Sequence, residues 1–178
     1  MRDHPFTLGV ASGDPTADGV LLWTRLAPDP LVADGGMPPK SVRVDWQVAT
    51  DEAFTDVVRA GWAVASRALA HSARVEVQGL LPDRVYHYRF RAGPHLSATG
   101  RTRTFPAPGT PVSSLRLATL SCQSLVAGRF AALRHLAQTE HDVVLHLGDY
   151  IYESQGPENP AAGVDRRHRP FRELSTLE

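Results

Sequence analysis

The 178-residue sequence has only one cysteine, Cys122, so it cannot form an intramolecular disulfide. It also has no net charge, because 19 Lys and Arg balance 19 Asp and Glu, and this leaves no electrostatic basis for binding nucleic acid or an anionic membrane. No apolar run is long enough to span a bilayer, and the opening residues lack the pattern of a signal peptide. What is present is 42% hydrophobic residues with 14 glycines and 14 prolines, which is typical of a globular protein rich in turns.

Residues 1–105 show the short alternating patterns of β-strands. The clearest strand is Val42–Val48, where apolar and polar residues alternate. Further strands and one turn are expected as follows: strands over Phe6–Val10, Val20–Leu26, Val57–Val64, Val75–Val77, Tyr86–Phe90 and Leu96–Phe105, and a turn at Ser12–Pro15. Several short strands at this spacing predict a two-sheet sandwich.

The segment Gly79–Tyr86 contains leucines, a proline and then a tyrosine. This order resembles the fibronectin type III pattern, and it predicts that the Tyr86 hydroxyl makes a corner hydrogen bond within the sandwich. The alternative is that Tyr86, Tyr88 and Phe90 form an exposed face that binds a carbohydrate or a peptide.

A stretch rich in proline and glycine at 106–111 predicts a linker between two domains. We place the domains at residues 1–108 and 112–178.

The pattern after the linker predicts a βαβ unit, with a strand at Leu115–Leu120, a helix at Gly128–Thr139 and a second strand at Val143–Leu147. Such a unit has parallel strands and a right-handed crossover. The short apolar run of the second strand predicts that it is buried between two layers.

Three side chains that suit metal binding follow these two strands. Cys122 comes just after the first strand and Asp149 just after the second, so parallel pairing places both at the same edge of the sheet. Tyr152 follows three residues later, and Gly148 allows the sharp turn that would bring it back toward Asp149. A thiolate, a carboxylate and a phenolate would repel one another without a cation. Ferric iron is a natural candidate, because a highly charged ion favours the deprotonated form of its ligands.

Each of these residues also has a simpler interpretation. Cys122 could be a packed core residue, Asp149 part of a turn and Tyr152 an exposed aromatic residue. His146, inside the second strand, is predicted to be a hydrogen-bonded core histidine and not a ligand. The cluster Arg166–Arg169 could attract phosphate, but a solvated surface segment is the preferred interpretation.

Longer motifs make nearly the whole chain resemble the alkaline phosphatase D family, also called PhoD-like metallophosphatases. Phe6–Pro15 and Leu22–Arg25 resemble the start of that family's N-terminal domain. Ser121–Gln123 and His146–Glu153 resemble the first two motifs of its catalytic domain. The resemblance implies a fibronectin type III-like all-β sandwich followed by the start of an α/β metallophosphoesterase domain.

The resemblance also implies a phosphomonoesterase or phosphodiesterase that is secreted, on the cell surface or periplasmic, and acts on a phosphate ester. Its cofactors would be Fe³⁺ and Ca²⁺, with Cys122 and Tyr152 binding iron and Asp149 bridging iron and calcium. Family members are exported by the twin-arginine route, and no twin-arginine signal is present here. Because the family's catalytic domain extends far beyond this length, we expect an N-terminal fragment that is inactive alone and lacks a C-terminal half.

Three other functions are compatible with the pattern. Purple acid phosphatases also combine a fibronectin-like domain with a motif resembling Gly148–Tyr152, but they have an aspartate where Ser121-Cys122 stands. A non-enzymatic sandwich module that binds a partner or a sugar is the second possibility. The third is a split enzyme whose missing half is a separate chain.

Overall fold

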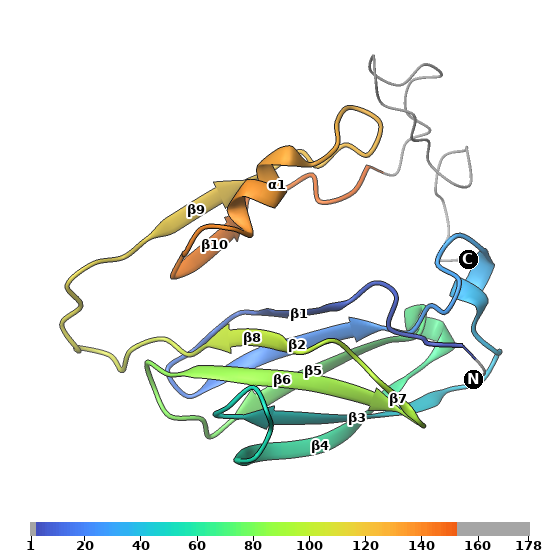
Figure 1. Cartoon of the computed structure of the whole chain (residues 1–178), viewed down its shortest axis with the longest axis horizontal. Coiled ribbons are helices and arrows are strands. Elements are labelled where there is room, and N and C mark those ends of the chain that lie inside the picture. The colour runs from blue at the N-terminus through green and yellow to red at the C-terminus, as the bar shows by residue number, and fades with distance from the viewer. Residues whose placement is uncertain (1–2, 153–178) are drawn as a thin grey trace. The chain divides into compact units, whose positions relative to one another are not determined.

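The computed structural model describes residues 3–152 (Figure 1). The chain divides into two compact units, the first running to Pro111 and the second beginning at Val112. Within the described residues, no helix is long and apolar enough to cross a membrane. The predicted surface cluster at 166–169 lies outside the described residues.

The first unit contains two antiparallel sheets, seen as two layers in Figure 1. One sheet has the order β1-β2-β5, with β1 at Val10–Gly13, β2 at Gly19–Arg25 and β5 at Ser72–Gln78. The other has the order β4-β3-β6, and both β7 and β8 pair with β6. Its strands are β3 (Val42–Ala49), β4 (Val57–Ala65), β6 (Val85–Ala92), β7 (His95–Leu96) and β8 (Gly100–Arg103). Two 3-10 helices, Ala33–Gly36 and Arg67–Leu69, lie in connections.

The inner faces of the two sheets share one hydrophobic core. Leu22 from β2 packs in the same cluster as Val44 from β3 and Phe90 from β6, and all three are fully buried. Because successive side chains of a strand point to opposite faces, the buried residues of these strands lie on the side of each sheet that faces the core. The predicted sandwich-like arrangement of residues 1–105 is therefore confirmed.

Tyr86 makes the predicted corner hydrogen bond. Its hydroxyl accepts the backbone N–H of Leu81 at 2.9 Å and lies 3.5 Å from the carbonyl oxygen of the same residue. The alternative of an exposed aromatic binding face is wrong, because Tyr86, Tyr88 and Phe90 are each at most 2% exposed. These rings fill the space between the sheets and are not available to a ligand.

The first predicted strand begins later than expected. Phe6 is buried, but it precedes a turn in which the N–H of Gly9 donates to the Phe6 carbonyl and Gly9 adopts a φ of +76°. Strand β1 then starts at Val10 and includes Ser12 and Gly13, which were predicted to form a turn. Phe6 is thus a buried anchor before the sheet and not part of it.

The predicted strand Leu96–Phe105 is divided into β7 and β8. Ser97 explains the interruption, because its N–H donates to the Phe90 carbonyl while its hydroxyl accepts the Phe90 N–H at 2.9 Å. The side chain of Ser97 thereby takes the place of a backbone partner, and the chain leaves the ladder before β8.

The second unit contains β9 (Leu117–Leu120), α1 (Ala131–Leu136) and β10 (Val143–His146). The two strands are parallel, with Leu117 opposite Val143 and Leu120 opposite His146. At the start of β9, the N–H of Arg116 donates to an Asp142 carboxylate oxygen at 2.8 Å, and its guanidinium lies 3.0 Å from Glu140. These bonds fix the register of the parallel pair at its amino end.

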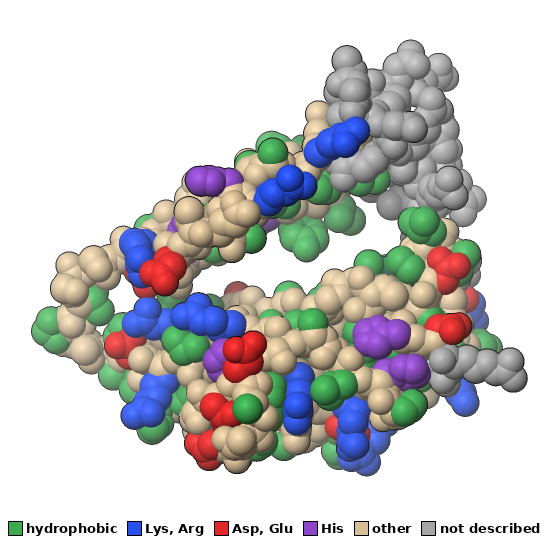
Figure 2. Space-filling view, viewed as in Figure 1, with side chains coloured by type: hydrophobic (Ala, Val, Ile, Leu, Met, Phe, Trp, Pro, Cys, Tyr) green, Lys and Arg blue, Asp and Glu red, His purple; other side chains and the backbone are tan. Residues whose placement is uncertain are grey.

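Two predictions for this unit are wrong. The helix is six residues long and begins after Phe130, whose φ of +55° is incompatible with a continuing helix, so the predicted span 128–139 is too long. The second strand is not buried, since the side chains of Val144 and Leu145 are 48% and 42% exposed. Figure 2 shows hydrophobic side chains (green) at the surface of the second unit. Burying a strand on both faces needs a covering layer on each, and among residues 112–152 only one short helix is present.

Candidate metal centre

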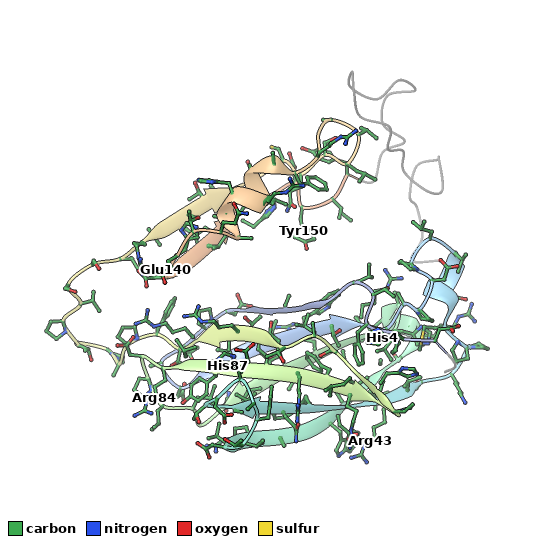
Figure 3. All side chains as sticks on the ribbon, viewed as in Figure 1. His4, Arg43, Arg84, His87, Glu140 and Tyr150 are labelled. Carbon is green, nitrogen blue, oxygen red and sulfur yellow. The ribbon has the colours of Figure 1, made fainter. Side chains whose placement is uncertain are left out.

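The loops that follow β9 and β10 are held side by side by backbone hydrogen bonds. The N–H of Leu147 donates to Leu120 O at 2.8 Å, which is the last bond next to the strands. Beyond it, the N–H of Cys122 donates to the carbonyl oxygen of Gly148 at 3.2 Å. The N–H of Gln123 donates to the carbonyl oxygen of Asp149 at 3.0 Å. The two loops therefore remain paired past the strand ends. Figure 3 labels the neighbouring Tyr150.

This pairing brings the three predicted ligands together. The Cys122 thiol lies 3.3 Å from Asp149 Oδ2, and the Tyr152 hydroxyl lies 3.1 Å from the same oxygen. Both groups donate to the carboxylate, so a single oxygen atom accepts two hydrogen bonds. The predicted proximity of the three side chains is confirmed, and their role as metal ligands stays a prediction.

The backbone at both loops is in an unusual conformation. Cys122 has a φ of +59° and Asp149 a φ of +51°, both in the left-handed region that non-glycine residues rarely adopt. Gly148 has a φ of +120°, consistent with its predicted role in a sharp turn. Two successive residues with positive φ turn the chain back so that the Asp149 side chain faces Cys122.

The hydrogen bonds around the carboxylate change the acidity of Tyr152. The hydrogen bond with Cys122 contributes most, followed by desolvation and by the hydrogen bond and charge of Asp149, and together they raise the pKa of Tyr152 from 10.0 to about 12. Without a cation, the phenol is therefore firmly protonated at neutral pH. A bound metal ion would have the opposite effect, since it favours the phenolate.

Two neighbouring residues form a further contact between the loops. His146 Nε2 lies 2.5 Å from the side-chain nitrogen of Gln123, and His146 Nδ1 accepts the N–H of Gly148 at 3.4 Å. His146 is hydrogen-bonded as predicted, but it is half-buried and not a core residue. Gln123 was not identified from the sequence, although its position directly after Cys122, past the same strand end, could have indicated it.

The three donors are of mixed type. In the described part of the chain, no three or more His, Cys, Asp and Glu side chains are grouped closely enough to hold a metal ion. Cys122 and Asp149 form a pair of that kind, and Tyr152 adds a phenol. The described residues therefore offer three potential donors, Cys122, Asp149 and Tyr152.

Comparisons with known proteins identify the family to which the chain belongs. A model of the PhoD-like phosphatase N-terminal domain matches residues 1–106, and a PhoD-like phosphatase model matches residues 117–178. The chain belongs to the PhoD-like phosphatase family. This membership decides between the two resemblances drawn from the sequence, in favour of the PhoD-like enzymes over the purple acid phosphatases.

Individual relatives agree with the family assignment. Alkaline phosphatase D of Bacillus subtilis (strain 168) is 55% identical over 153 residues, which are 86% of this chain and 26% of that protein. A solved structure of PhoD has a TM-score of 0.91 and 50% sequence identity, covering 98% of this chain and 33% of that one. The chain thus spans about a quarter of the curated PhoD-like relative and a third of the solved chain.

The fibronectin type III prediction stays a prediction. A human fibronectin type III domain has a TM-score of only 0.41 and 11% identity to this chain. A match with a TM-score this low carries no argument about the fold of the first unit.

Proposed function

We propose that this chain is the N-terminal part of a metal-dependent phosphomonoesterase or phosphodiesterase of the alkaline phosphatase D type, acting outside the cytoplasm. Cys122, Asp149 and Tyr152 bind a ferric ion in this proposal, and Asp149 also bridges to a calcium ion. The observation that carries the proposal is the convergence of the thiol and the phenol on one carboxylate oxygen.

The chemistry of the three donors fits a ferric ion. Carboxylate and phenolate oxygens are hard ligands that suit highly charged cations, and phenolate ligation of iron is known from haem proteins. In the metal-free chain, the hydrogens on the Cys122 sulfur and the Tyr152 oxygen both point to Asp149 Oδ2, at sulfur–oxygen and oxygen–oxygen distances of 3.3 and 3.1 Å. Replacing these two protons by one cation removes the repulsion among the three deprotonated groups.

In this proposal, the residues of this chain position groups for the reaction. A metal pair bound here would polarise the phosphoryl oxygens and orient the attacking oxygen. Asp149 is suited to bridging because its Oδ2 already accepts two hydrogen bonds, while its backbone is tied to Gln123. With three donors in the described part of the chain, we expect little or no hydrolysis from residues 1–178 alone.

The first test is a ferric iron titration of the 178-residue chain, followed by visible absorption. We expect a phenolate-to-iron charge-transfer band that disappears in Tyr152→Phe. The matched control is Tyr150→Phe, which removes a neighbouring phenol that is 72% exposed and should leave the band in place. A wild-type chain without the band, or a band lost only in Tyr150→Phe, would contradict the assignment of Tyr152.

The second test concerns activity. In a longer chain that includes the rest of the family's catalytic domain, we expect Cys122→Ala and Asp149→Asn each to lower phosphate ester hydrolysis by about 100-fold or more, since even indirect partners of metal ligands are worth about 10–100-fold. Hydrolysis by the 178-residue chain at a rate comparable with the longer protein would contradict the expected inactivity of residues 1–178.

A further inference from the structure

A side-chain bridge joins the two loops that carry the proposed iron ligands. His146, at the end of β10, reaches the side-chain amide of Gln123 in the loop after β9, with 2.5 Å between the two Nε2 atoms. On its other side, the imidazole accepts the N–H of Gly148 through Nδ1 at 3.4 Å. Its ring also packs edge-on against Tyr150, with centroids 5.1 Å apart.

These contacts fix which nitrogen of His146 carries the proton. Because Nδ1 accepts the N–H of Gly148, a neutral imidazole must carry its hydrogen on Nε2, facing Gln123. The Gln123 atom that faces Nε2 is the amide nitrogen, which cannot accept this hydrogen, so the contact requires the amide to be turned over, with its carbonyl oxygen toward His146. The ring is therefore oriented by one hydrogen bond to each loop.

The bridge ends on the immediate neighbours of two proposed ligands. Gln123 follows Cys122 directly, and Gly148 directly precedes Asp149. The backbone of Gln123 adds a second connection, because its N–H donates to the carbonyl oxygen of Asp149 at 3.0 Å. A displacement of the imidazole would therefore change the separation of the Cys122 and Asp149 side chains.

We propose that His146 and Gln123 are positioning residues that fix the distance between Cys122 and Asp149 before a metal binds. The inference rests on the proposed iron site for its consequence, but the arrangement itself is a property of the metal-free chain. Neither residue touches the ion in this proposal. Residues that orient metal ligands in this way typically affect metal affinity by about 10–100-fold.

The first experiment needs no metal. His146→Phe keeps an aromatic ring of similar shape but removes both hydrogen bonds. We expect faster amide hydrogen exchange at Cys122 and Gln123, whose N–H groups donate across the loops, with unchanged exchange at Leu147, whose N–H bonds to the strand. Unchanged exchange at all three amides would overturn the inference whether or not iron binds.

The second experiment measures the ferric iron dissociation constant and the charge-transfer band. We expect His146→Phe and Gln123→Ala each to weaken iron binding by about 10–100-fold and to shift the band, with the double variant no weaker than the worse single variant. Gln123→Glu keeps an acceptor for the Nε2 hydrogen and should retain affinity near that of the wild type. The matched control is His141→Phe, because His141 lies beyond the opposite end of β10 and contacts Thr139.

The outcomes separate the two proposals. If the wild-type chain binds iron and the His146 and Gln123 variants bind it equally well, the positioning role is wrong and the iron site stands. If the wild-type chain shows no iron band, the iron site fails for this chain, and hydrogen exchange alone decides the positioning role. A loss of affinity in His141→Phe as large as in His146→Phe would also overturn the inference, since it would indicate general destabilisation.

Discussion

Removing one atom, the hydroxyl oxygen of Tyr86, tests how much the corner hydrogen bond stabilises the first unit. The side chain is 2% exposed, and its hydroxyl accepts the N–H of Leu81 at 2.9 Å. Tyr86→Phe keeps the ring in the core and removes only the oxygen. The variant should fold normally and be less stable.

The magnitude follows from what the oxygen contributes. A neutral hydrogen bond stabilises a protein by about 0.5–1.5 kcal/mol net, and a donor left unpaired in a buried position costs about 1–3 kcal/mol. The Leu81 side chain is 57% exposed, so water can partly replace the missing acceptor. We therefore expect Tyr86→Phe to lower the free energy of unfolding by about 1–2 kcal/mol, which is about 5–10 °C in melting temperature for a unit of this size.

Tryptophan fluorescence provides the assay. All three tryptophans, Trp23, Trp46 and Trp62, lie in the first unit, so urea unfolding of the whole chain followed at this signal reports that unit alone. The urea midpoint should fall while the slope of the transition stays constant.

The control keeps the backbone donor and changes the side chain beside it. Leu81→Ala leaves the N–H of residue 81 bonded to Tyr86 and should change stability by less than about 0.5 kcal/mol. The reasoning is refuted if Tyr86→Phe unfolds at the wild-type midpoint, or if Leu81→Ala destabilises the unit as much as Tyr86→Phe does.

Two further predictions concern other contacts. Gly61→Ala should destabilise the first unit by about 1–3 kcal/mol, because a Cβ there would lie 2.6 Å from the indole ring of Trp46. The control is Gly13→Ala, whose Cβ would meet nothing within 4 Å. Equal urea midpoints for the two variants would contradict the predicted clash. In the metal-free chain, the raised pKa of Tyr152 means that the unfolded state loses this proton first, so stability should fall as pH rises from 10 to 12. Ultraviolet titration should show a phenol ionisation step near pH 12 in the wild type that is absent in Tyr152→Phe. If Tyr152→Phe instead lacks a step near pH 10, the hydrogen-bonded geometry of Tyr152 is contradicted.

The central strands of the sandwich could be predicted because their burial is encoded residue by residue. In β3 and β6, apolar and polar side chains alternate, and this alternation specifies both the strand and its inner face. The ends of the unit could not be predicted in this way. Phe6 has the same apolar character as a strand residue, and only the tertiary structure shows it to be an anchor before a turn. Ser97 ends β7 through a hydrogen bond to Phe90, which hydrophobic patterning does not report.

For the candidate site, the sequence predicts which strand ends lie together but not the contacts between the loops that follow them. Parallel pairing after a crossover places Cys122 and Asp149 at one sheet edge, and the structure brings them within 3.3 Å. The bridge between Gln123 and His146 was not predictable, because it depends on the register of two loops beyond the strands. The sequence predicts a buried β10, whereas this strand is exposed, and the reason is different. An apolar run indicates that a strand needs covering layers, but it does not say which residues provide them.

The left-handed backbone of Cys122 and Asp149 has a consequence for engineering and for natural variation. Each such conformation at a non-glycine residue costs about 1–3 kcal/mol, and glycine relieves most of that strain. Selection of this chain for thermal stability alone would therefore favour Cys122→Gly and Asp149→Gly, and it would erase two proposed iron ligands while improving the fold. A stabilised variant library of this protein needs both positions held constant, since a gain in melting temperature there signals the loss of the site.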